Sequence, residues 1–179
     1  DINKKIFKKI INLNLYDKMN DLNGGDLLIS YSNGKIIPSE ILELYKYKIN
    51  FHCGPLEFPG RDPHHWAAYY KSNIYGGVCH FMDPAPDTGR IIKHINIKIS
   101  PNLEPEKIDR IGEECIKKIF LSLVNEINSV ILKTSKDSWK GKVRTRKDLL
   151  SMCNFSKLKT SEIKHRKYAF SGFEKYFKY

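Results

Sequence analysis

Three polar side chains have the types that acyl transfer to an amine requires. Such a reaction needs a hydrogen-bond donor for the oxyanion, a group that exchanges protons near neutral pH, and a carboxylate that orients this group. The sequence offers Asn50 as the donor, His52 as the proton-exchanging group and Asp87 as the carboxylate. Asn50 and His52 are two residues apart, so on an extended strand both project to the same side. We expect them to address one carbonyl group together.

Each of these residues also has an ordinary structural explanation. A histidine at a strand end is often a satisfied structural residue, an asparagine there often caps a turn, and an aspartate before Thr-Gly often forms an Asx turn. The flanking sequence favours function, because glycines surround all three positions and permit close backbone approach to a ligand. These glycines are Gly54, Gly60, Gly76, Gly77 and Gly89.

An α/β sheet is the framework that would position Asn50 and His52. Residues 27–31 form a short apolar run typical of a buried strand, a proline opens an amphipathic helix over 38–44, and a second strand is predicted over 48–51. Strand, helix and strand at this spacing indicate a right-handed crossover between parallel strands. Asn50 and His52 would then lie at the carboxyl end of a parallel strand, where open sheets bind ligands.

The rest of the chain is predicted from turn residues and hydrophobic periodicity. Residues 53–62 and 83–89 are rich in glycine and proline, which indicates two irregular loops, and Asp87 lies on the second. Apolar residues at intervals of three and four predict a long helix near the middle of the chain. The further predicted elements are helices over 5–19, 63–72 and 105–128 and strands over 77–82 and 91–99.

Composition places the chain among ordinary globular proteins. It has 179 residues, 41% of them hydrophobic and 28% charged, and no apolar run reaches the roughly 18 residues that a membrane-spanning helix requires. The four cysteines lie far apart, without the pairs of a zinc site, so we expect reduced thiols, a cytoplasmic protein and no metal. The net charge of +11 fits either an anionic substrate or a solvated lysine surface.

Three ordered segments resemble the family of formyltransferases that use 10-formyltetrahydrofolate. They are residues 50–61 (NFHCGPLEFPGR), 77–83 (GVCHFMD) and 87–92 (DTGRII), within a similarity over roughly residues 25–130. The resemblance implies that Asn50 holds the formyl oxygen, that His52 acts as acid, base and oxyanion stabiliser, and that Asp87 orients His52 and relays protons. It also implies folate contacts from Ser30, Tyr31, Gly34, Lys35 and Asp83, and acceptor contacts from Gly54, Pro55, Gly60 and Arg61.

The same resemblance implies a Rossmann-like formyltransferase sheet, mainly parallel with an antiparallel part. Only 49 residues precede Asn50, so we expect the chain to lack some of the family's N-terminal strands. Residues 1–135 are predicted to form the catalytic domain. Residues 136–179 are predicted to be a basic and aromatic C-terminal extension.

The loop after His52 indicates the acceptor class. Cys53-Gly54-Pro55 is more similar to the branch that acts on nucleotide-linked amino sugars, and the tail is too short for the barrel domain of the tRNA enzyme. We therefore expect a nucleotide sugar as the acceptor and 10-formyltetrahydrofolate as the donor. Methionyl-tRNA, though less favoured, or glycinamide ribonucleotide remains an alternative acceptor. A truncated, non-catalytic binding relative and a homodimer also stay open.

Other residues have two explanations each. His80 matches a family histidine that is usually structural, and His64 and His65 fit a helix start better than a metal site. The basic residues 140–147 fit either a phosphate contact or a solvated turn. The aromatic residues within 63–72 are expected to pack on the sheet rather than to stack on a base.

Overall fold

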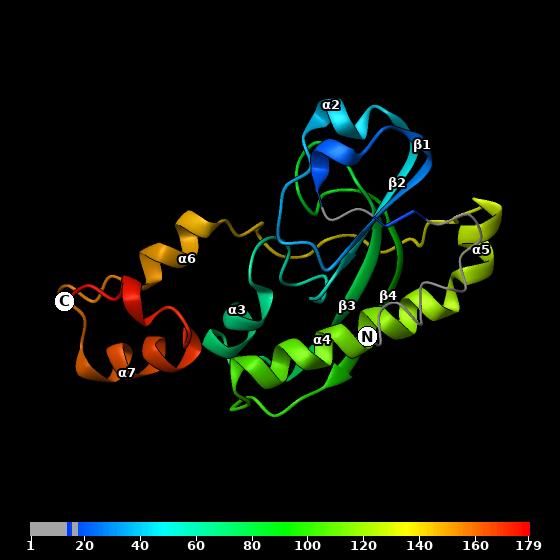
Figure 1. Ribbon diagram of the computed structural model, residues 1–179. Helices are drawn as coiled ribbons and strands as arrows, with labels where there is room; N and C mark the ends of the chain where they lie inside the picture. The colour runs from blue at the N-terminus through cyan, green and yellow to red at the C-terminus, as the bar shows by residue number, and fades with distance from the viewer. Residues whose placement is uncertain (1–13, 16–17) are drawn as a thin grey trace.

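The computed structural model describes residues 14–15 and 18–179, which form a mixed sheet flanked by helices (Figure 1). The predicted helix over 5–19 lies mostly outside the described residues. The strands are β1 (Gly25–Tyr31), β2 (Tyr45–His52), β3 (Ile74–Phe81) and β4 (Ile91–Lys98). The helices are η1 (Met19–Asp21), α2 (Ser39–Leu42), α3 (Pro63–Tyr69), α4 (Pro105–Ser122), α5 (Val124–Ser129), α6 (Arg146–Met152), α7 (Thr160–Ala169) and η2 (Glu174–Tyr176).

The four described strands follow the order β1-β2-β3-β4, with one parallel and two antiparallel pairings. β1 and β2 are parallel and joined through α2, as the sequence predicts. The α/β class is confirmed, although the parallel share is smaller among the described strands than expected. In the antiparallel register Asn50 pairs with His80, so their side chains lie on the same face of the sheet.

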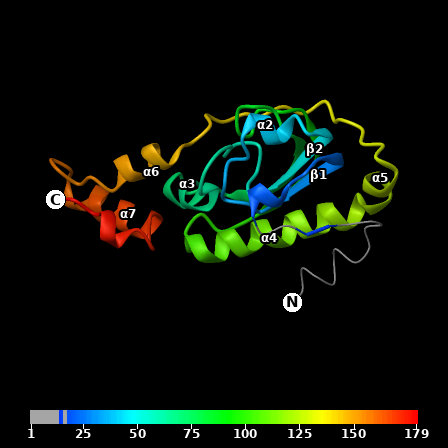
Figure 2. The same cartoon turned by 45° about the horizontal axis from the view of Figure 1, so that its top comes forward.

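Helix α4 covers the other face of the sheet, below it in Figure 2. Phe51 and Phe120 are fully buried between them, 5.4 Å apart between ring centroids. Gly77 permits this contact, because a Cβ there would lie 2.6 Å from Cγ2 of Ile116. The helix predicted over 105–128 is interrupted at Leu123, just after the Ser122 hydroxyl donates to the carbonyl of Ile119. Such side-chain bonds compete with the helical backbone pattern.

A second hydrophobic core joins α3 and α4 to the C-terminal helices. Trp66 and Phe170 are both buried in it, with ring centroids 5.3 Å apart. Leu149 of α6 and Ile108 of α4 belong to the same cluster. The C-terminal part of the chain therefore packs against α3, at the left of Figure 1.

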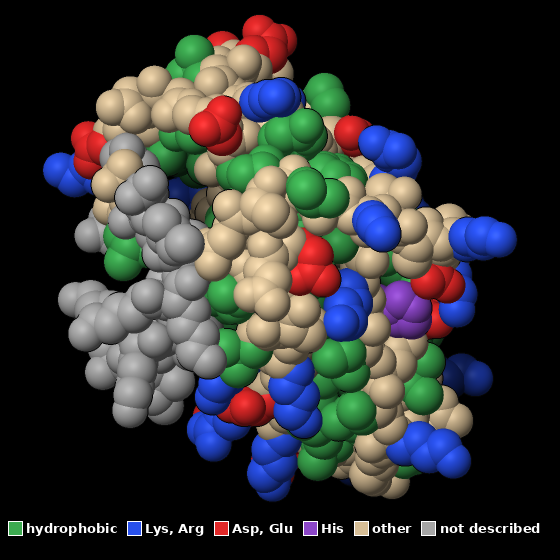
Figure 3. Space-filling view, turned by 90° about the vertical axis from the view of Figure 1, so that its right-hand side faces the viewer, with side chains coloured by type: hydrophobic (Ala, Val, Ile, Leu, Met, Phe, Trp, Pro, Cys, Tyr) green, Lys and Arg blue, Asp and Glu red, His purple; other side chains and the backbone are tan. Residues whose placement is uncertain are grey.

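Residues 130–145 connect α5 to α6 and pass across the molecule, as the yellow segment of Figure 2 shows. On the face shown in Figure 3, lysine and arginine side chains are spread among apolar and acidic ones. Among the described residues, no helix has both the length and the apolar character to cross a membrane.

Candidate active site

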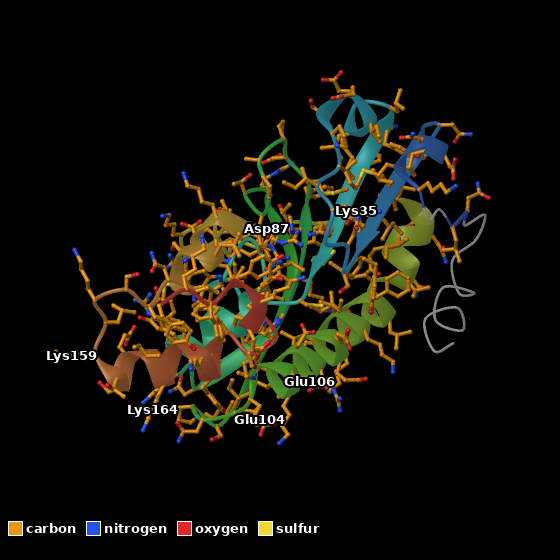
Figure 4. The ribbon with its side chains drawn as sticks, turned by 60° about the vertical axis from the view of Figure 1, so that its left-hand side comes forward. Lys35, Asp87, Glu104, Glu106, Lys159 and Lys164 are labelled. Atoms are coloured by element: carbon orange, nitrogen blue, oxygen red, sulfur yellow. The ribbon has the colours of Figure 1, made fainter. Side chains whose placement is uncertain are left out.

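Asp87 is the centre of a hydrogen-bonded cluster beside the carboxyl-terminal half of β2 (Figure 4). Its Oδ2 lies 3.2 Å from Nδ1 of His52, and its Oδ1 lies 3.1 Å from Nε2 of His80. The amide Nδ2 of Asn50 lies 3.5 Å from Oδ1 of Asp87 and 3.2 Å from Nε2 of His80. The structure thus brings the three predicted residues together and adds His80 to them.

The carboxyl group of Asp87 is held ionised. Burial alone would raise its pKa, but the neighbouring His52 and His80 and the backbone N–H of Gly60, which donates at 2.7 Å, lower that pKa well below its usual range. A carboxylate that accepts several such bonds strongly favours its charged form. Asp87 therefore brings a fixed negative charge to two imidazole rings.

Both rings face oxygen acceptors on both sides. His52 has Asp87 at Nδ1 and the carbonyl of Phe58 at Nε2, 3.0 Å away. His80 has Asp87 at Nε2 and the carbonyl of Phe81 at Nδ1, 2.7 Å away. A neutral imidazole has one N–H, whereas an imidazolium has two, so only an imidazolium could donate to both contacts at once. The arrangement places two rings of a proton-exchanging type beside one carboxylate.

Close backbone contacts fix the loop that carries Asp87 and the loop before α3. Asp87 itself has a left-handed backbone with φ of 50°, a conformation that aspartate tolerates better than most residues. At Gly89 a Cβ would overlap the carbonyl oxygen of Phe81, and at Gly60 it would overlap the backbone of Arg144. The glycines predicted to allow close approach therefore allow it between protein segments around the cluster.

A pocket of about 610 Å³ opens beside the cluster and is lined by Asn50, His52, His80 and Asp87. Four of the five residues expected to contact folate line it, namely Ser30, Gly34, Lys35 and Asp83. Tyr31 does not, because it projects to the α4 face and packs against Phe51 and Phe120. In Figure 4 the label of Lys35 stands beside the blue and cyan strands β1 and β2, and that of Asp87 stands beside the green strands β3 and β4.

The residues expected to contact the acceptor divide in a similar way. Gly60 and Arg61 line the pocket, whereas Gly54 and Pro55 do not. Gly54 lies behind the imidazole of His52, where a Cβ would be 2.6 Å from Nε2. Its role in this structure is to leave room for the ring. Arg61 donates to the carbonyl of Gly34 at 2.5 Å, which joins the two sides of the pocket.

Several residues that sequence reasoning did not place in the site belong to it. Trp139 packs edge-on against the rings of His52 and His80, and residues 143–146 line the pocket. These residues come from the segment assigned to the C-terminal extension, and no local pattern connects them with β2. The sequence singled out His80 through its match to a family histidine and residues 140–147 through their charge, but neither signal placed them beside Asn50.

The basic segment and its aromatic neighbours have mixed environments. Lys140 pairs with Glu57 at 3.2 Å, whereas Arg144 lies over the ring of Trp66 at 4.6 Å and donates to the hydroxyl of Tyr70 at 2.8 Å. Trp66 is buried as expected, but Tyr70 is 52% exposed. Arg144 and Arg146 both line the pocket, so two cations of the segment lie beside a ligand bound there.

His64 and His65 lie at the start of α3 in different environments. His65 is buried, burial lowers its pKa to about 4, and its Nδ1 lies 2.7 Å from the carbonyl of Ala169. His64 instead pairs with Asp109 at 3.2 Å and lines the pocket. His65 is therefore a neutral structural histidine that joins α3 to the end of α7.

Comparison with known proteins connects this geometry to one family. The family profile described as formyl transferase matches residues 11–124. Methionyl-tRNA formyltransferases of Clostridium perfringens and Thermodesulfovibrio yellowstonii are 30% and 36% identical to the chain over 109 residues. These matches cover 57% and 58% of this chain and 35% of each relative. The chain thus spans about a third of the length of the curated relatives it matches.

Solved structures with the same fold include sugar formyltransferases. A 4-N formyltransferase from Francisella tularensis superposes with a TM-score of 0.70 at 20% identity, over 94% of this chain and 71% of that one. The formyltransferase PseJ from Anoxybacillus kamchatkensis, solved with a formamido UDP-sugar and tetrahydrofolate, gives a TM-score of 0.61 at 26% identity, over 77% and 74%. The Rossmann-like formyltransferase fold expected from the sequence is confirmed.

Proposed function

The chain belongs to the formyl transferase family, and on that premise we propose that it transfers a formyl group from 10-formyltetrahydrofolate to the amine of a nucleotide-linked amino sugar. The observation that carries the proposal is the cluster of Asn50, His52 and Asp87 around one pocket. The acceptor class is supported by the solved sugar formyltransferases and by the Gly54-Pro55 loop. The lengths of the relatives leave the activity of this chain to experiment.

The pocket has the size and chemistry that the formyl donor requires. Its volume of about 610 Å³ falls within the range of roughly 300–1,000 Å³ that is usual for small-molecule sites. Ile36, Ile37 and Pro84 supply apolar lining for a flat ring system. Lys35 is a cation at the same wall and suits the anionic tail of a folate.

The proposed reaction begins when the acceptor amine attacks the formyl carbon. A carbon–nitrogen bond forms, and the carbonyl oxygen becomes an oxyanion, which the amide N–H of Asn50 and the imidazolium of His52 stabilise. Asp87 helps to take a proton from the amine and relays it through the cluster. The bond from the formyl carbon to N10 of the folate then breaks, and N10 receives this proton, so the products are the formamide and tetrahydrofolate.

The direct test mixes the purified protein with 10-formyltetrahydrofolate and a panel of amino-sugar nucleotides and follows release of tetrahydrofolate. We expect release with at least one acceptor and its loss in His52→Ala. Absence of release with every sugar nucleotide would reject the sugar proposal. Binding of a folate analogue without any turnover would favour a non-catalytic relative.

Methionyl-tRNA is the second candidate acceptor, because the curated sequence relatives are methionyl-tRNA formyltransferases. The same assay with methionyl-tRNA and with glycinamide ribonucleotide distinguishes these two acceptors from the sugar nucleotides. Formylation of tRNA alone would replace the sugar by tRNA and leave the chemistry of the cluster unchanged.

A further inference from the structure

One side chain outside the predicted site contacts both imidazole rings of the cluster and the loop that carries its carboxylate. The indole of Trp139 lies 5.6 Å from the ring of His52 and 5.0 Å from that of His80, centroid to centroid, each at an interplanar angle of 82°. Its Nε1–H donates to the carbonyl of Gly89 at 3.0 Å. Gly89 is on the loop that carries Asp87. Trp139 therefore contacts both imidazoles and the loop of the carboxylate between them.

We propose that Trp139 is a positioning residue, which holds the rings of His52 and His80 against Asp87 and thereby makes the C-terminal segment part of the reaction centre. The catalytic part of this inference rests on the proposed function. The geometric part concerns only the contact between the indole and the two rings.

The contact restricts the motion that would break the cluster. An imidazole ring that rotates away from Asp87 would lose its bond to the carboxylate, and an edge-to-face neighbour opposes that rotation. The indole also contributes to the burial of the two rings, which keeps out water that would otherwise solvate the ion pairs and weaken them. Positions of reacting groups that differ by about 1 Å change rates strongly, so this restriction bears on turnover.

The backbone on both sides of Trp139 is fixed to the catalytic half of the chain. The N–H of Ser135 donates to the carbonyl of Ile91 at 2.8 Å, and the N–H of Lys140 donates to that of Leu56 at 2.9 Å. At Gly141 a Cβ would overlap the carbonyl oxygen of Glu57, so only glycine permits this approach. The indole is thus held in one place although it lies on neither a helix nor a strand.

The charged groups near the indole have partners of their own. On its own segment Asp137 pairs with His94 of β4 at 3.4 Å, and Lys140 pairs with Glu57 of the loop at 3.2 Å. Asp87, shared between the two imidazoles, is the charge that faces the rings themselves. Among the described residues, His52 and His80 are the titratable rings in aromatic contact with Trp139.

A simpler role for Trp139 is to fill a small hydrophobic cluster. Leu56, Val78 and Ile91 form this cluster, and Trp139 packs against it. Trp139→Phe separates the two roles, because phenylalanine fills much of the cluster but cannot donate to Gly89. A filling role predicts nearly unchanged kinetics, whereas a positioning role predicts a kcat lower by about tenfold with KM values for donor and acceptor within about twofold.

Fluorescence tests the contact without any activity. The chain has two tryptophans, so Trp66→Phe leaves emission from Trp139 alone. The emission of an indole depends on the rings that it contacts. His52→Gln and His80→Gln should therefore each change the emission of Trp139, whereas His94→Gln, whose ring pairs with Asp137 instead, should leave it unchanged.

Each result has a defined meaning. If Trp66→Phe unfolds the protein, the difference in emission between the wild type and Trp139→Phe reports the same residue. Trp139 emission that neither the His52 nor the His80 substitution changes would overturn the inference. A clear histidine-dependent response in a protein without turnover would reject the proposed function and retain the contact.

Discussion

The carboxylate of Asp87 pairs with two imidazole rings at once, and this shared partner couples His52 to His80. Each of its oxygens faces one ring, and the backbone N–H of Gly60 adds a third bond. Removing the charge would leave two rings that face carbonyl oxygens without a counterion. At this scale Asp87 matters through its charge and its two oxygens, so an isosteric neutral residue is the informative substitution.

Asp87→Asn should lower kcat in the formyl-transfer assay by about 10²–10⁴-fold, which is the usual size of a lost proton-transfer partner. The KM for the folate should change little, because Asp87 lies at the histidine end of the pocket. Asp26→Asn is the matched control, since it removes the same charge from an exposed position on β1. A variant at Asp87 that keeps most of its turnover would contradict the assigned role.

His65 makes the free energy of unfolding depend on pH, and the sign of this dependence can be predicted. Burial lowers its pKa from 6.5 to about 4 in the folded state. Between these values the unfolded chain binds a proton and the folded chain does not, so stability falls as the pH falls through this window. At the acid end of the window, the buried neutral His65 lowers the free energy of unfolding by up to about 3 kcal/mol.

His65→Asn should therefore lose less stability between pH 6.5 and pH 4 than the wild type does. The asparagine amide can still donate to the carbonyl of Ala169, which His65 contacts through Nδ1. Urea unfolding at several pH values in that window measures the difference. Parallel curves for both proteins would show that another group causes the acid sensitivity.

Elements of regular structure were predictable where a periodic pattern fixes them. Alternation in β2 places Asn50 and His52 on one face, and glycine-rich loops follow where expected. The break of the long helix at Leu123 was not predictable, because the apolar spacing continues through it. Trp139 reaches the site through long-range contacts with the ends of strands and loops. No local sequence pattern encodes contacts of that kind.

The packing of α4 on the sheet depends on the absence of a side chain at Gly77. Gly77→Ala should lower the free energy of unfolding by about 1–3 kcal/mol, because the new Cβ would lie 2.6 Å from Cγ2 of Ile116 and 3.0 Å from its backbone nitrogen. Urea denaturation would show this as a lower midpoint with an unchanged slope. Gly34→Ala is the control, since its Cβ would meet only Arg61 at 3.9 Å. Equal midpoints for both variants would mean that α4 shifts at no cost.

At the scale of the whole molecule, the net positive charge bears on which acceptor the proposed reaction uses. The chain carries a net charge of +11, and Lys35, Arg61 and Arg144 are among the pocket residues. A nucleotide sugar brings a short pyrophosphate to such a pocket, whereas a tRNA brings phosphates across a wide surface. The same positive charge attracts both, but the number of phosphates that it neutralises differs.

The salt dependence of the acceptor KM should therefore identify the acceptor class. Each neutralised phosphate contributes a slope of about 0.7–0.9 to a plot of log affinity against log salt concentration, because it releases bound counterions. A pyrophosphate acceptor should give a slope of at most about 2, whereas a tRNA held through many phosphates should give a much steeper one. The measurement uses the acceptor that supports the fastest turnover, with the folate kept saturating.

Arg144→Gln should reduce the slope by about 1 if this arginine contacts a phosphate, whereas Lys164→Gln, on α7 outside the pocket, should leave it unchanged. A steep slope that Lys164→Gln reduces would instead show that the C-terminal helices bind a nucleic acid.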